Sequence, residues 1–230
     1  MRMALYAIAD LHLSLGEEKP MDIFRGWTNY IDRLTRNWTA LVQPADTVVV
    51  AGDVSWAMSL DGARTDFAFL DRLPGKKLLL KGNHDYWWNT RRKMDAFLAS
   101  QGFESIRILH NSAERYEPWA LCGSRGWFFD AEPDSDKKVL LREVGRLQMS
   151  IDAGRALGGV PLVFLHYPPV TAAARCDEIM DALHRNGITR CWYGHLHGPS
   201  IRRAVQGVVE GIEFRLVSCD AVDFTPVRIA

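Results

Sequence analysis

Short apolar runs that each lead into aspartate, asparagine or histidine are the feature that most constrains the fold of this chain. Continuous runs of valine, leucine, isoleucine and aromatic residues are typical of strands that are covered on both faces of a sheet. Stretches with the apolar spacing of amphipathic helices lie between the runs, as at residues 23–41 and 140–151. This alternation predicts an α/β protein of stacked layers. The runs are ALYAIAD (to Asp10), TVVVAGD (to Asp53), KKLLLKGNHD (with Asn83, His84 and Asp85), VPLVFLHY (with His166) and RCWYGHLH (with His195 and His197).

The length of 230 residues predicts one domain spanning residues 1–230. The hydrophobic fraction of 47% and the charged fraction of 24% are those of an ordinary soluble protein, and no apolar run is long enough for a transmembrane helix. The N-terminal stretch MRMALYAIAD predicts a first strand, because it reaches Asp10 too soon for a signal peptide. We therefore expect a cytoplasmic protein without a membrane partner. From Ser200 onward, apolar residues alternate around Gly207 and Gly211, which predicts antiparallel hairpins.

Charge and cysteine content argue against several other classes of protein. The 28 basic and 28 acidic residues give a formal net charge of +0, so no global field would attract a nucleic acid polymer. The cysteines form no CxxC pair, which argues against a zinc ribbon and a redox motif, and we expect reduced, mostly buried thiols. The sequence leaves the oligomeric state open. The cysteines are Cys122, Cys176, Cys191 and Cys219.

Polar residues at the ends of the apolar runs are placed for metal binding. In open α/β sheets, ligands gather beyond the carboxyl ends of the strands. Asp10 and His12 are two residues apart, so their side chains leave an extended chain on the same side, and His195 and His197 repeat this spacing. Asp53 follows a glycine that permits a sharp turn, and its carboxylate has two oxygens that can bridge two ions. A mixture of histidine and aspartate suits Zn, Mn or Fe better than Ca.

The chain resembles the calcineurin-like metallophosphoesterases. The motif series of that family is DxH, GD, GNH[D/E], a lone His and GHxH, and all five blocks stand here in order between residues 10 and 197. One DxH or one GD is a weak signal, whereas five ordered blocks at the ends of predicted strands are specific. The blocks are Asp10-Leu11-His12, Gly52-Asp53, Gly82-Asn83-His84-Asp85, His166 and Gly194-His195-Leu196-His197.

The resemblance implies a fold and a metal centre. The fold would be a layered α/β/β/α sandwich of two mixed sheets flanked by helices, with the metal site at the C-terminal ends of the strands. The cofactors would be two divalent or trivalent transition-metal ions, Mn, Fe or Zn. The implied ligands are Asp10, His12, Asp53 and His197 for the first ion, and Asp53, Asn83, His166 and His195 for the second.

The resemblance also implies two catalytic residues. His84 would face the substrate phosphate as an acid or a charge stabiliser, and Asp85 would orient His84. Together these assignments predict a dinuclear enzyme that hydrolyses a small phosphodiester or phosphomonoester by attack of a metal-activated hydroxide. The alternatives are a metal-dependent nuclease acting on DNA or RNA, which the neutral charge disfavours, and a non-catalytic scaffold, which the complete set of ligand positions disfavours.

Two branches of the family fit less well. Protein serine/threonine phosphatases have a VDRG-like stretch after GD and favour Glu after GNH, whereas this chain has Val54-Ser55-Trp56-Ala57 and Asp85. In the lipid A precursor pyrophosphatases a basic residue replaces the histidine that His84 provides here. Aromatic residues near the predicted site would either pack the sheet margins, which we favour, or stack against a base or an aryl leaving group. These residues are Trp56, Tyr86, Trp87, Trp88, Tyr167, Trp192 and Tyr193.

Overall fold

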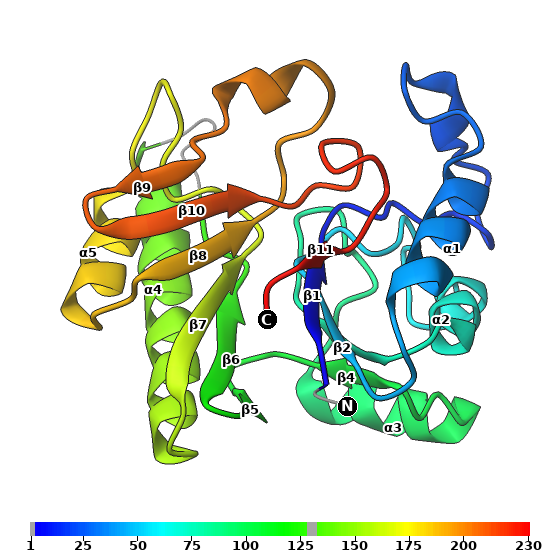
Figure 1. Ribbon diagram of the computed structural model, residues 1–230, viewed down its shortest axis with the longest axis horizontal. Helices are drawn as coiled ribbons and strands as arrows, with labels where there is room; N and C mark the ends of the chain where they lie inside the picture. Colours follow the sequence, from blue (N-terminus) through cyan, green and yellow to red (C-terminus); the bar gives the residue numbers. More distant parts are fainter. Residues whose placement is uncertain (1–2, 128–132) are drawn as a thin grey trace.

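The computed structural model describes residues 3–127 and 133–230. Two β-sheets lie face to face, with helices on the outer face of each (Figure 1). This arrangement confirms the expected sandwich of two mixed sheets with flanking helices. The first sheet is covered by α1 (Tyr30–Leu41), α2 (Arg64–Arg72) and α3 (Arg91–Gln101), and the second by α4 (Pro133–Ala156) and α5 (Asp177–Arg185).

The first sheet has the strand order β11-β1-β2-β3-β4. Strands β1 to β4 are parallel, and β11 pairs with β1 in the antiparallel sense. Ile8 pairs with Val50, and Val50 pairs with Leu79, so the first three strands end at the same level. The strands are β1 (Leu5–Ile8), β2 (Thr47–Val50), β3 (Lys76–Leu79), β4 (Ile106–Ile108) and β11 (Val227–Arg228).

The second sheet has the strand order β5-β6-β7-β8-β10-β9. Its four central strands are parallel, and the two edge strands are antiparallel to their neighbours. Leu165 pairs with Tyr193, so β7 and β8 also end at one level. The elements are β5 (Glu114–Tyr116), β6 (Trp119–Ser124), β7 (Val160–Leu165), β8 (Arg190–Tyr193), β9 (Gly207–Val209) and β10 (Ile212–Leu216), with 3-10 helices η1 (Met21–Ile23) and η2 (Gly198–Arg203).

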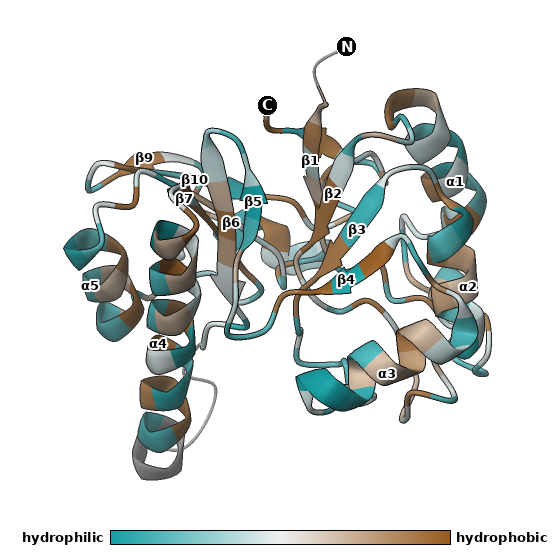
Figure 2. Ribbon diagram, turned by 90° about the horizontal axis from the view of Figure 1, so that it is seen from below, coloured by the Kyte–Doolittle hydropathy of each residue, from teal (hydrophilic) through white to brown (hydrophobic). Residues whose placement is uncertain are grey.

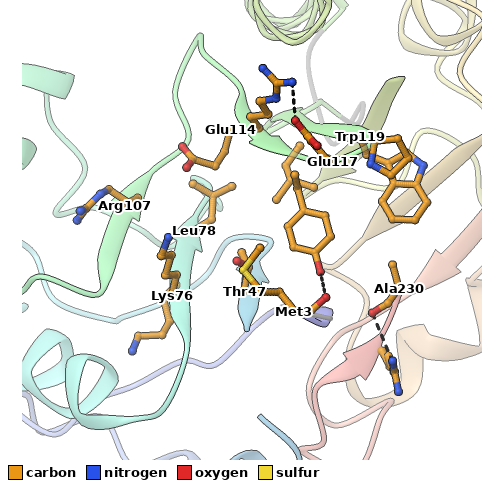
Figure 3. Close-up of a pocket in the computed structure, with 15 residues that line it drawn as sticks. Met3, Thr47, Lys76, Leu78, Arg107, Glu114, Glu117, Trp119 and Ala230 are labelled. Atoms are coloured by element: carbon orange, nitrogen blue, oxygen red, sulfur yellow. Dashed lines mark hydrogen bonds and ion pairs between the residues drawn. The ribbon is translucent and has the colours of Figure 1, made fainter. Parts of the chain in front are cut away.

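Alternate residues of each strand face different apolar layers. In β3 and the residue after it, Leu78 and Leu80 belong to the layer between the sheets, whereas Leu79 packs toward the helices. Apolar and polar residues alternate along the helix ribbons, as in amphipathic helices that have one apolar and one polar face (Figure 2). At the amino ends of the strands, a cavity of about 720 Å³ opens between the sheets (Figure 3). Its lining mixes charged and aromatic side chains, among them Lys76, Arg107, Glu114, Glu117 and Trp119.

The expected helix over residues 23–41 is shorter than the apolar spacing predicts. The regular helix α1 begins only at Tyr30, and the segment before it contains the 3-10 helix η1. Gly26 and Asn29 have φ values of 92° and 53°, which interrupt a right-handed helix. Trp27 is nevertheless buried, so the apolar stripe marks burial correctly without marking a helix.

The C-terminal tail agrees with the sequence in part. Strands β9 and β10 form an expected antiparallel hairpin, in which Val209 pairs with Ile212. Strand β10 also pairs with β8 in parallel, and β11 joins the other sheet, neither of which the alternation predicts. All four cysteines are free and buried, as expected. Among the residues that the structure describes, no helix is long and apolar enough to span a bilayer.

Candidate metal centre

The predicted ligands follow five parallel strands that end at one edge of the sandwich. Strands β1, β2 and β3 lead to Asp10, Asp53 and Asn83, and strands β7 and β8 lead to His166 and His195. Within each sheet these strands end at a common level, and the two sheets face each other (Figure 1). The topology therefore brings side chains together that are far apart in the sequence.

The centre of the site is a buried group of two carboxylates and two imidazoles. Ligand atoms of Asp10, Asp53 and His166 all lie within 4.8 Å of one another. Oδ2 of Asp53 is 3.5 Å from Nε2 of His166 and 3.7 Å from Nε2 of His12. All four side chains are at most 1% exposed. The Asp53 carboxylate thus lies between two histidines.

The other predicted ligands border this group on two sides. Oδ1 of Asn83 is 2.6 Å from Nε2 of His166 and 3.0 Å from Nδ1 of His195. On the other side, the ring centroids of His197 and His12 are 5.3 Å apart. All seven predicted ligand residues therefore lie in one place, in two groups that meet at Asp53; their binding of metal stays a prediction.

Burial makes this site a poor place for uncompensated charge. It raises the pKa of Asp10 to about 7, and it raises the pKa of Asp53 well above its ordinary value, with the charge of Asp10 as the second cause. Burial also lowers the pKa of His12 and His166 well below the ordinary range and that of His195 to about 4. The imidazoles are therefore neutral and free to act as ligands, while the carboxylates need positive charge nearby.

The donor atoms fit transition-metal ions. Both ring nitrogens of His12 are buried without a hydrogen-bond partner in the described part of the chain. An unsatisfied buried polar atom costs about 1 to 3 kcal/mol, a cost that a bound cation would remove. Neutral imidazole nitrogens together with carboxylate and amide oxygens suit Mn, Fe or Zn.

The backbone at the site is strained and closely packed. A Cβ on Gly82 would lie 2.0 Å from Oδ1 of Asp53, so only glycine fits beside that carboxylate. Four predicted ligands have left-handed φ values, a conformation that non-glycine residues adopt at a cost of about 1 to 3 kcal/mol each. They are Asp10 (58°), His12 (46°), Asp53 (52°) and His195 (71°).

His84 lies against an aromatic wall at the edge of this group. Its ring centroid is 4.4 Å from that of Trp56, 5.6 Å from that of His12 and 6.2 Å from that of Tyr86. Its Nδ1 is buried without a partner among the described residues. Burial, and then the charge of His197, lower its pKa. The ring is therefore neutral until an anion is placed beside it.

Asp85 is expected to orient the His84 ring, but the hydrogen bonds that its carboxylate accepts in the described residues come from elsewhere. Oδ2 of Asp85 accepts from the backbone N–H groups of Gly82 (2.7 Å) and Asp53 (2.9 Å). Oδ1 accepts from the backbone N–H groups of Val54 (2.8 Å) and Ser55 (3.3 Å) and from Nε1 of Trp87 (2.9 Å). Because both oxygens are occupied in this way, Asp85 ties the loop after β2 to the loop after β3 and leaves the His84 ring to other contacts.

Most of the sequence matches a known protein family. A model of the calcineurin-like phosphoesterases matches residues 3–199. The chain belongs to the calcineurin-like phosphoesterase family. This membership confirms the resemblance carried by the five sequence blocks, and it makes the protein a metal-dependent phosphoric ester hydrolase of a family that uses divalent metals.

Solved structures share the fold of this calcineurin-like phosphoesterase. The phosphopantetheinyl hydrolase PptH from Mycobacterium tuberculosis is 18% identical, with a TM-score of 0.54, over 94% of this chain and 89% of that chain. TT1561 from Thermus thermophilus is 12% identical, with a TM-score of 0.53, over 86% of this chain and 83% of that chain. At such identities the likeness concerns the fold alone. No curated protein matches the sequence.

The aromatic residues of this phosphoesterase divide between the two expected roles. Trp87, Trp192 and Tyr193 are buried in the apolar clusters, whereas the buried Tyr167 has its ring centroid 4.4 Å from that of His195. Tyr86, at the other extreme, is 51% exposed. The half-buried Trp56 stacks on His12, with ring centroids 4.8 Å apart, and also contacts His84. Packing thus accounts for Trp87, Trp192 and Tyr193, whereas Trp56 and Tyr86 lie beside His84, and Tyr167 lies beside His195.

Two residues at the site could not be found from the motifs. Trp27 lies with its ring centroid 5.9 Å from that of His12 and 6.4 Å from that of His197. Nζ of Lys19 lies 4.8 Å from the ring centroid of Trp56. Both residues belong to the long connection between β1 and α1, where no block of polar residues marks them. The sequence places both after the first motif, and the apolar stripe marks the burial of Trp27, but neither signal points to the site.

Proposed function

We propose that the protein hydrolyses a small phosphodiester or phosphomonoester at a dinuclear metal centre. The observation that supports two ions is the position of Asp53, whose Oδ2 is 3.7 Å from Nε2 of His12 and 3.5 Å from Nε2 of His166. A carboxylate between two sets of nitrogen and oxygen donors suits a bridging ligand.

Each set of donors would hold one ion. Asp10, His12 and His197 would bind the first, and Asn83, His166 and His195 would bind the second, with Asp53 shared. When bound, two divalent or trivalent Mn, Fe or Zn ions neutralise phosphoryl oxygens and lower the pKa of water, which supplies hydroxide for attack on phosphorus. The raised pKa values of Asp10 and Asp53 support this assignment, because cations would replace protons there.

His84 would act on the substrate directly. Its ring lies beside His12, and its Nδ1 has no partner in the described part of the chain. A substrate phosphate next to this ring favours the imidazolium, which can stabilise the phosphoryl oxygens or donate a proton to the leaving oxygen. Asp85 would serve this step indirectly, since it holds the backbone of Gly82 and Asp53 in place.

Metal analysis and turnover test the proposal together. Purified protein should hold close to two transition ions per chain, and with Mn it should hydrolyse a bis-aryl phosphodiester or an aryl monophosphate. Asp53→Asn should lose both metal and turnover, whereas Asp152→Asn, an exposed change on α4, should lose neither. Absence of turnover with every divalent ion would refute the proposal. DNA and RNA cleavage that falls steeply with added salt would favour the nuclease instead.

We also propose that residues 1–230 form one domain that works in the cytoplasm. All four cysteines are unpaired, as is usual for proteins of a reducing compartment. The apolar layer between the sheets draws on both halves of the chain, which supports a single unit. A single cooperative unfolding transition and recovery of activity in the cytosolic fraction are the expected outcomes, and two separate transitions would contradict the first.

A further inference from the structure

A group of basic side chains lies beside the predicted metal centre. In the two sheets β4 neighbours β3, and β6 neighbours β7. Residues that follow β4 and β6 are thus displaced by one strand spacing, about 5 Å, from Asn83 and His166. Lys81 follows β3, Arg125 follows β6, and Arg146 reaches in from α4. These three residues, which we call the basic cluster, line one small cavity with His110.

The basic cluster has more positive charge than its surroundings neutralise. Glu143 is 1% exposed, and its Oε1 accepts from Arg146 at 2.6 Å and from Arg125 at 3.3 Å. Within residues 3–127 and 133–230 the Lys81 ammonium makes no direct hydrogen bond or ion pair, although the charges of Asp85 and Glu143 act on it. Three positive charges against these two negative charges leave an excess of one. An ion network around Glu143 accounts for the arginines but not for Lys81.

Buried donors around the basic cluster also lack acceptors. Nε of Arg125 and Nε1 of Trp88 and Trp127 are buried without a hydrogen-bond partner in the described residues. The Arg125 guanidinium is 4.7 Å from the ring centroid of Trp127, and the ring centroids of Trp88 and His110 are 5.8 Å apart. Within the described residues the basic cluster is therefore short of acceptor oxygens.

The size of the cavity decides where such a ligand would bind. Its volume is about 10 Å³, which is room for about one water molecule. An anionic group would therefore lie at the mouth, where Lys81, His110 and Arg146 are half-buried and still reach solvent. Burial lowers the pKa of His110, and the charges of Arg146 and Lys81 lower it further, so the positive charge at the mouth comes from the lysine and the arginines.

We propose that the basic cluster binds a second anionic group of the substrate. Preferred substrates then carry a phosphate or a carboxylate in addition to the phosphoester that is cleaved. The two groups are separated by a short spacer, because Lys81 follows the same strand as Asn83, and Arg125 follows β6, one strand away from β7 and His166. This inference rests on the proposed function. The basic cluster would select among small phosphoesters by their charge and not by their shape.

Matched probes test the inference by calorimetric titration of the metal-loaded protein. Glycerol 3-phosphate carries one anionic group, 3-phosphoglycerate adds a carboxylate, and propane-1,3-diol bisphosphate adds a phosphate. One or both of the doubly anionic probes should bind about tenfold tighter than glycerol 3-phosphate, as expected for a charge-assisted hydrogen bond. The comparison of the two tells a carboxylate from a phosphate. Equal affinity for all three probes would overturn the inference.

Variants locate the effect. Lys81→Gln and Arg146→Gln should each weaken binding of the doubly anionic probe about tenfold. The affinity for glycerol 3-phosphate should stay the same in both variants. Arg142→Gln, one turn away on α4 and exposed, is the matched control and should change neither. An equal loss of affinity for the singly and doubly anionic probes would show that the basic cluster does not select for a second anionic group. Metal-loaded protein that binds the probes as expected but hydrolyses no phosphoester would refute the proposed function alone.

Discussion

The replacement Asp85→Asn tests how the two ligand-bearing loops are held together. The carboxylate accepts five hydrogen bonds, two at Oδ2 and three at Oδ1, and all come from buried groups. Asparagine keeps the shape but replaces one oxygen by an amino group, so at least two buried N–H donors lose their acceptor. At about 1 to 3 kcal/mol for each orphaned donor, the free energy of unfolding should fall by about 2 to 6 kcal/mol. This is a large share of the total stability of a typical domain.

Urea unfolding of the metal-free protein measures this loss without any contribution from bound ions. Asp152→Asn is the matched control, because this aspartate is exposed and its replacement should change stability by less than about 0.5 kcal/mol. Asp85→Asn should also weaken metal retention, since two of the lost hydrogen bonds hold the backbone of Asp53 and Gly82. A loss of stability below about 1 kcal/mol with full metal content would refute the loop-tying role.

Three further predictions concern the same site. His84→Ala should lower turnover by about 10² to 10⁴-fold at normal metal content, and a loss of metal as well would make His84 a ligand. In metal-free protein, burial raises the pKa of Asp10 to about 7 from 3.8, so the folded state keeps a proton that the unfolded state has released, and stability from this group is lost as the pH rises through 7. Urea unfolding should therefore show that the free energy of unfolding of the wild type, relative to that of Asp10→Asn, falls by about 3 kcal/mol between pH 4.5 and pH 8. If the difference in free energy between the two proteins were the same at both pH values, the burial argument would be contradicted. Gly82→Ala should destabilise the protein by several kcal/mol because its Cβ would meet Asp53, whereas Gly145→Ala in α4 meets nothing within 4 Å and should stabilise by about 0.5 to 1 kcal/mol; equal thermal midpoints would refute the close approach.

The strand ends of this site could be predicted from the sequence because two independent patterns coincide there. Apolar runs mark covered strands, and the polar residues that stop each run mark the edge where strands of a parallel sheet end together. Asp53, Asn83 and His166 are examples, since each follows β2, β3 or β7 within a few residues. Family resemblance then added the pairing of two sheets, which no local pattern contains.

Contacts between side chains and backbone could not be predicted in the same way. Asp85 accepts hydrogen bonds from the backbone N–H groups of Val54 and Ser55. Because nearly every residue type has a backbone N–H group, the sequence does not mark such donors. The apolar stripe before Tyr30 predicts a helix, but Gly26 and Asn29 adopt left-handed conformations that tertiary packing selects. Likewise, alternation near the C-terminus predicts strands without saying that β11 would cross to the first sheet.

The left-handed backbone at Asp10, His12, Asp53 and His195 has a consequence for anyone who evolves this protein in the laboratory. Glycine at any of these positions would relieve backbone strain but would remove a predicted metal ligand. A screen for heat resistance alone would therefore enrich stable variants that have lost activity. Selection rounds that alternate heating with an assay of activity would remove such inactive variants.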